Sequence, residues 1–187
     1  MAASWAKGAY ANGTRDESAV KRVDYHNTFW FPIPPPQLWE LIGRFDEFES
    51  WSAWLAGFRA GDGGLVAGNV LHGTVIPPVS YRLRLSVQLQ RCIRPRLVEA
   101  EVGGDVSGRG MLRLEAAGDG TSAEVTWSLA MRSAPLRAAA LVAYPLMCWG
   151  HDRVVDMAVS GFQLRACRTV LGDKAGQPDR PAPSTTG

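Results

Sequence analysis

Apolar and polar side chains alternate strictly from Tyr81 to Gln90, and this pattern constrains the fold more than any other in the chain. The apolar positions are Tyr81, Leu83, Leu85, Val87 and Leu89. Because successive side chains of a strand point to opposite faces of a sheet, the segment predicts a strand with one apolar face. The segment from Pro135 to Val170 places apolar residues at helical spacing instead, with His151 in the middle of the stripe. Together the two patterns predict a sheet whose apolar face is covered by one long helix.

Further strands and two short helices are predicted before the long helix. The first strand, Lys21–Phe31, ends at a run of prolines, which lack the N–H group that continued pairing needs. Short helices are expected at about Gln37–Gly43 and Asp46–Trp51. The remaining strands are separated by glycine-rich turns and are expected at Leu55–Arg59, Val70–Ile76, Leu97–Val102, around Leu112 and Leu114, and at Val125–Met131. This order of elements predicts an α+β fold with antiparallel strands.

The register of one hairpin can be predicted from parity. If Arg91 pairs with Arg96, then Val87 faces Ala100, and the apolar residues of both strands lie on the same face of the sheet. The glutamates of the second strand then lie on the outer face, beside arginines of the first, where opposite charges are favourable. The arginines of this outer face are therefore expected to form a solvated surface and not a nucleic-acid site.

Composition limits the other possibilities. A chain of 187 residues suits one domain, which we place at residues 19–171, between a flexible N-terminal arm (residues 1–18) and a disordered C-terminal tail (residues 172–187). A formal charge of +2 gives no overall attraction to nucleic acid. The longest apolar run, Ala138–Trp149, contains Pro145 and is shorter than the ~20 residues of a membrane-spanning helix.

The cysteines and the first residues bear on localisation. Three cysteines are an odd number, and none are spaced as Cys-x-x-Cys, which favours a reducing compartment. The first twelve residues lack the apolar stretch of a secretory signal. We expect a cytoplasmic protein, monomeric or homodimeric, without a stable membrane anchor.

Several motifs resemble those of one protein superfamily. They are Leu38-Trp39 after the prolines, Trp51 in the second short helix, Pro78–Leu83, Gly104–Gly110 and Trp149–Val154. These motifs resemble the START-like superfamily, also called SRPBCC, and are most similar to its bacterial polyketide cyclase/dehydrase branch. The resemblance covers about Asp24 to Leu171. It implies a helix-grip fold, in which a curved antiparallel sheet of about seven strands wraps around a long C-terminal helix and two short helices follow the first strand.

The predicted site is an apolar cavity between the concave sheet and the long helix. His151 is the ionisable side chain on the inward helix face, and Asn27 is the polar residue on the inner face of the first strand; both are candidate polar anchors. Tyr144 lies two turns before His151 on nearly the same face and is a candidate to share its role. The candidate wall residues are Phe29, Phe31, Tyr81, Leu83, Leu85, Leu112, Trp127, Leu129, Met147 and Val154.

Three functions remain open, and the least favoured is a non-enzymatic partner that loads or protects a quinone or lipid at a membrane, because no amphipathic anchor is present. The first is a carrier or binding protein for a small hydrophobic molecule that is polyketide-, lipid- or quinone-like. The second is a polyketide cyclase, aromatase or dehydratase that uses His151, with Tyr144, to move protons. A buried histidine is also frequently structural. No metal site or cofactor is expected, because the three histidines lie in separate predicted elements and no ligand spacing is present.

Overall fold

The computed structural model describes residues 22–79, 81–132 and 134–175, and its centre is one antiparallel sheet. The seven strands are ordered β1-β7-β6-β5-β4-β3-β2, so strands that follow each other in the chain are also neighbours in the sheet, except for β1 and β2. The strands are β1 (Arg22–Phe31), β2 (Leu55–Ala60), β3 (Val70–Val75), β4 (Leu83–Ile93), β5 (Leu97–Gly104), β6 (Val106–Ala117) and β7 (Gly120–Met131). The predicted α+β class and its strands are confirmed.

Two short helices follow β1, as predicted, and a 3₁₀ turn lies between them. The three segments are α1 (Pro35–Gly43), the 3₁₀ turn η1 (Phe45–Glu47) and α2 (Phe48–Trp51). Proline occupies the first turn of α1, where its missing N–H costs nothing because no partner exists there. The buried face of α1 consists of Leu38, Trp39 and Leu41.

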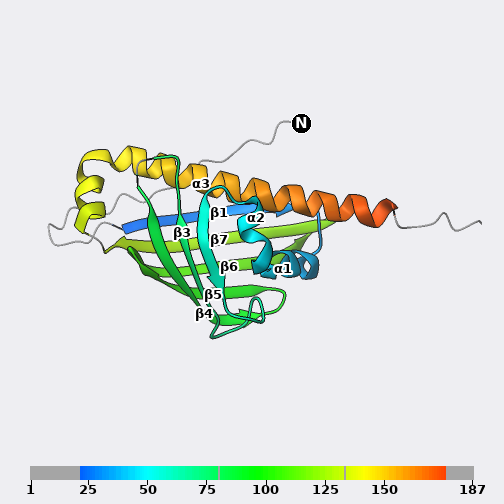
Figure 1. Ribbon diagram of the computed structural model, residues 1–187. Coiled ribbons are helices and arrows are strands. Elements are labelled where there is room, and N and C mark those ends of the chain that lie inside the picture. The colour runs from blue at the N-terminus through cyan, green and yellow to red at the C-terminus, as the bar shows by residue number, and fades with distance from the viewer. Residues whose placement is uncertain (1–21, 80, 133, 176–187) are drawn as a thin grey trace, which may run out of the picture.

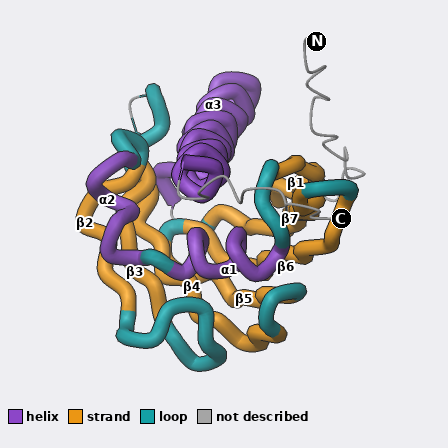
Figure 2. The backbone as a smooth tube through the Cα atoms, turned by 90° about the vertical axis from the view of Figure 1, so that its right-hand side faces the viewer, coloured by secondary structure: helices purple, strands orange, loops and turns teal. Residues whose placement is uncertain are grey.

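The long helix α3 (Ala134–Ala175) lies along the concave face of the sheet (Figure 1). Seen nearly along its axis, the strands curve around it on one side (Figure 2). Figure 1 also shows the first turns of α3 bent away from the rest of the helix. The helix contains Pro145, which cannot donate the interior hydrogen bond and is a usual cause of a kink. The helix continues four residues past the predicted domain end at residue 171. The predicted arm (residues 1–18) and residues 176–187 lie outside the described residues.

Large side chains fill the space between sheet and helix at one end only. There, Phe29 and Phe31 of β1 pack with the buried face of α1 and with Phe45. A second, smaller cluster lies toward the other end of β1 and β7, where Met131 and Met147 are packed by Val23, Tyr81 and Leu83. The core is therefore solid beneath α1 and much thinner beyond it.

The predicted register of the β4–β5 hairpin is wrong by two residues up to Leu89 and by three from Arg91 on. Val87 pairs with Val102 in place of Ala100, and Arg91 pairs with Glu99 in place of Arg96. A bulge between Leu89 and Arg91 inserts an extra outward residue, and this single insertion is invisible to an argument from alternation. Because a shift of two preserves parity, Val87 and Val102 still face the helix.

Candidate ligand-binding cavity

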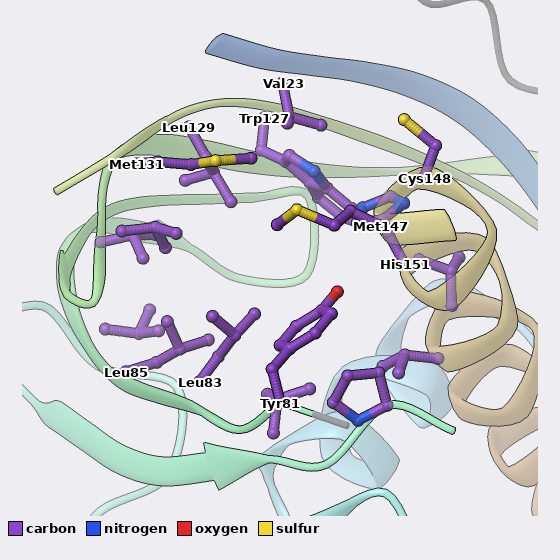
Figure 3. Close-up of a pocket in the computed structure, with 18 of the residues that line it drawn as sticks. Val23, Tyr81, Leu83, Leu85, Trp127, Leu129, Met131, Met147, Cys148 and His151 are labelled. Atoms are coloured by element: carbon purple, nitrogen blue, oxygen red, sulfur yellow. The ribbon is translucent and has the colours of Figure 1, made fainter. Parts of the chain in front are cut away.

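A cavity of about 310 Å³ lies between the thin part of the core and the middle of α3 (Figure 3). Its size falls at the lower end of the range for small-molecule sites. The sheet contributes residues from β1 and β3 to β7, and α3 closes the opposite side. The wall consists of Val23, Val75, Pro77, Tyr81, Leu83, Leu85, Val87, Ala100, Val102, Val106, Gly110, Trp127, Leu129, Met131, Met147, Cys148, His151, Val154 and Val155.

Two inward-facing glycines of β6, which carry no side chain, help to make room for this cavity. The alternation that turns Val106 and Leu114 inward also places Gly108 and Gly110 on the inner face. Gly110 lies on the cavity wall, opposite Trp127 of β7. A Cβ atom at Gly110 would have no other heavy atom nearer than 3.8 Å, so the space above it is open. At Gly108 a Cβ would overlap the Ser128 carbonyl oxygen, so the bare backbone there is required.

Three rings from three elements form the aromatic end of the cavity. Tyr25 and Trp127 are direct partners on β1 and β7, and their rings stack with centroids 4.4 Å apart. The His151 ring of α3 meets both rings edge-on, at 5.1 Å from Tyr25 and 5.3 Å from Trp127. The wall position of His151 is therefore fixed by packing against two aromatic side chains.

The nitrogens of His151 are turned away from the cavity space. Nδ1 lies 3.3 Å from Oδ1 of Asp152. Nε2 exposes less than 1 Å² of surface, so it faces neither solvent nor the open cavity. Burial lowers the pKa of His151, and this effect outweighs the hydrogen bond to Asp152, which raises the pKa. His151 is therefore a neutral imidazole at pH 7.

Tyr81 supplies a hydroxyl group at the same end. Figure 3 shows its oxygen pointing across the cavity toward Met147 and His151 of α3. This oxygen lies 3.5 Å from the position that a Cβ at Gly150 would take, which is an ordinary contact distance, so Tyr81 reaches the surface of α3. Burial raises the pKa of Tyr81, as does the neighbouring Cys148, so the hydroxyl stays protonated.

The structure brings most of the predicted site residues together. Tyr81, Leu83, Leu85, Trp127, Leu129, Met147, Val154 and His151 all lie on the cavity wall. The side chain of Tyr144 lies outside the described part of the chain.

Four predicted site residues need correction, because the structure places them off the wall. Phe29, Phe31 and Leu112 are on the inner face as expected, but they belong to the solid core beneath α1. Asn27 donates through Nδ2 to the hydroxyl of Tyr25, 3.3 Å away, and so supports the stacked ring and not a ligand. The sequence pattern identifies the inner face, but it cannot tell the filled end from the hollow end.

Other wall residues were missed although their signal was present. Val23, Val87, Val102 and Met131 all carry the inward parity of their strands. Gly110 belongs to a glycine-rich segment and lies inside β6. A glycine at an inward strand position is the usable signal, because it leaves the sheet bare at that point.

Within the described residues, no three histidine, cysteine, aspartate or glutamate side chains are grouped closely enough to hold a metal ion. A search of the described helices also finds none that is long and apolar enough to cross a membrane.

Comparison of the sequence with protein-family models gives no match, and comparison with curated proteins gives none either. Solved structures do match. The Zhui aromatase/cyclase from Streptomyces sp. R1128 aligns with a TM-score of 0.61 and 15% identity, over 80% of this chain and 96% of that one. The protein TTHA0849 from Thermus thermophilus aligns with a TM-score of 0.63 and 11% identity, over 78% of this chain and 98% of that one.

A third match is norcoclaurine synthase from Thalictrum flavum, with a TM-score of 0.58 and 12% identity, over 82% of this chain and 99% of that one. At such identities the likeness establishes the arrangement of the backbone and nothing of the chemistry. The chain has the helix-grip fold, which it shares with these solved structures.

Proposed function

We propose that this protein binds a small hydrophobic molecule, polyketide-, lipid- or quinone-like, in the cavity between the sheet and α3, and acts as a carrier or binding protein. One observation supports this most strongly: the wall is built almost entirely from aliphatic and aromatic side chains. Each Å² of apolar ligand surface removed from water would contribute ~25 cal/mol to binding. Such a ligand needs few directed polar contacts, and the wall offers few.

The second candidate is a polyketide cyclase, aromatase or dehydratase acting in the same cavity. It is favoured by the likeness to a structure named as an aromatase/cyclase, and by the wall position of His151. The geometry of His151 argues against it. A general acid or base must come within hydrogen-bonding distance of the reacting proton, and Nε2 is covered while Nδ1 faces Asp152.

The test of the binding function begins with native mass spectrometry of the purified protein, followed by extraction and identification of any co-purifying molecule. In parallel, the neutral solvatochromic dye Nile red should bind with one-to-one stoichiometry. Leu129→Arg should abolish dye binding, because it places a charge on the cavity wall. Ser128→Arg is the matched control, since the adjacent residue lies on the outer face and should leave dye affinity unchanged.

His151→Phe distinguishes the two candidates. In a binding protein, the variant should change ligand affinity by less than about tenfold, because the nitrogens of His151 do not reach the cavity and only the packing of its ring is altered. In a cyclase, turnover of a candidate polyketide should fall ~10²–10⁴-fold while affinity is largely kept. Unchanged Nile red fluorescence on adding the wild-type protein would contradict the binding function itself.

A further inference from the structure

The wall of the cavity is uncharged as well as apolar. Among the described wall residues there is no Asp, Glu, Lys or Arg. A charged ligand group would therefore lose its water without gaining an ion-pair partner. The cost of burying an unpaired charge is several kcal/mol even after structural relaxation.

The polar wall residues do not relieve this cost. His151 carries no charge to offset an anion, and its Nε2 is covered. The indole Nε1 of Trp127 is covered in the same way and has no hydrogen-bond partner among the described residues. The hydroxyl of Tyr81 points into the cavity, and it can pair with one neutral oxygen or nitrogen of a ligand.

Two carboxylates lie behind the aromatic end and make it still less suited to an anion. Asp152 approaches Nδ1 of His151. Burial is the main cause that raises the pKa of Tyr25, and the negative charges of Asp152 and Asp156 raise it further. Tyr25 is stacked directly on Trp127, so this negative potential acts through the wall on anything bound there. Neither carboxylate belongs to the cavity wall, so neither is placed to pair with a ligand cation.

From these three observations we propose that the cavity accepts only uncharged molecules. The ligand class is a neutral hydrocarbon-rich compound with at most one carbonyl or hydroxyl group, placed beside Tyr81. Free fatty acids and other carboxylates are rejected, and so are amines in their ammonium form. This selectivity rests on the proposed binding function and specifies its ligands.

The test uses three probes that share one ring system and differ in charge. Anthracene-9-carboxamide and anthracene-9-carboxylate are nearly equal in size, and 9-(aminomethyl)anthracene is the cationic member. Displacement of Nile red at pH 7 measures the affinity of each. The carboxamide should bind at least about tenfold more tightly than either ion, because only the ions pay for an unpaired buried charge.

A variant of the cavity wall tests the charge preference in the opposite direction. Leu83→Lys places a cation on the wall and should reverse the preference, so that the carboxylate binds more tightly than the carboxamide. Circular dichroism establishes whether the variant is folded; if it is not, the three probes on the wild-type protein still decide. Equal or tighter binding of either ion to the wild-type protein would overturn the selectivity while leaving the binding function intact. Failure of Nile red itself to bind would instead overturn both.

Discussion

Tyr25 and Trp127 stack with their rings 4.4 Å apart and only 15° from parallel, and this pair joins the wall of the cavity to the first strand. The two residues are opposite each other in the β1–β7 ladder, which places their Cβ atoms on the same face. His151 then closes the group from α3, meeting both rings edge-on. One cross-strand pair thus fixes the position of the helix histidine relative to the sheet.

The first prediction concerns the energy of this stack. In a double-mutant cycle with Tyr25→Leu and Trp127→Leu, the coupling free energy of unfolding should be ~0.5–1.5 kcal/mol, the usual value of a stacked aromatic pair beyond its burial. Urea denaturation of the four proteins measures it. A cycle between Tyr25 and the distant Phe58 is the control and should give no coupling. A Tyr25–Trp127 coupling within error of that control would contradict the stacked geometry.

The second prediction is a pH dependence caused by His151. Its pKa is lowered in the folded protein from the ordinary value of 6.5, so below pH 6.5 the unfolded chain binds a proton that the folded one resists. The free energy of unfolding should therefore fall as the pH drops from 6.5 toward the lowered pKa, and should be insensitive to this group above pH 7. Asp152, which faces Nδ1, limits the effect but does not reverse it.

Urea denaturation between pH 5 and 8 measures this dependence. His151→Phe should flatten the curve below pH 6.5, because the group that takes up the proton is gone. A wild-type curve that rises on acidification through this range would contradict a buried, neutral His151.

The fold could be predicted from the sequence because its signals are periodic. Alternation around Tyr81 and Leu129 gives the inner face of the sheet, and helical spacing around His151 gives the covering element. Parity holds from Leu85 to Leu89, because the error in register before the bulge in β4 is two residues. A local sequence pattern is therefore sufficient to predict on which face of a strand or helix a side chain lies.

The site was less predictable, because it depends on how far the core is filled along the sheet. Phe29 has the same parity as Val23, yet it packs under α1 whereas Val23 lines the cavity. That difference is set by where α1 and α2 fold back onto the sheet, a tertiary contact with no local signature. The orientation of the His151 nitrogens likewise depends on Asp152, Tyr25 and Trp127 together.

The third prediction tests whether Gly110 provides space for the ligand. Gly110→Val should fill part of the cavity and weaken Nile red binding by ~1–3 kcal/mol, as expected for an overfilled site. The melting temperature should change little, since the Cβ has room and valine suits a strand. Arg109→Val, one residue away on the outer face, is the control and should leave dye affinity unchanged. Full affinity in a folded Gly110→Val variant would place the ligand elsewhere.

The last prediction concerns Gly161, where helix propensity and packing point in opposite directions. Replacing a helix-interior glycine by alanine normally stabilises a helix by up to ~1 kcal/mol. Here the new Cβ would meet the Trp51 ring at a distance too short for contact. That ring cannot move aside easily, because Phe162 packs against it at 4.9 Å and the Arg165 guanidinium lies 4.6 Å over it.

We therefore expect Gly161→Ala to destabilise the protein, by ~1–3 kcal/mol, which is the usual cost of overpacking. The free energy of unfolding in urea measures the sign directly. Ser160→Ala is the matched control on the exposed side of the same turn, and it should change stability by less than ~0.5 kcal/mol. A stabilised Gly161→Ala protein would mean that α3 does not approach α2 as closely as this contact requires, and that the helix covers the sheet less tightly at this end.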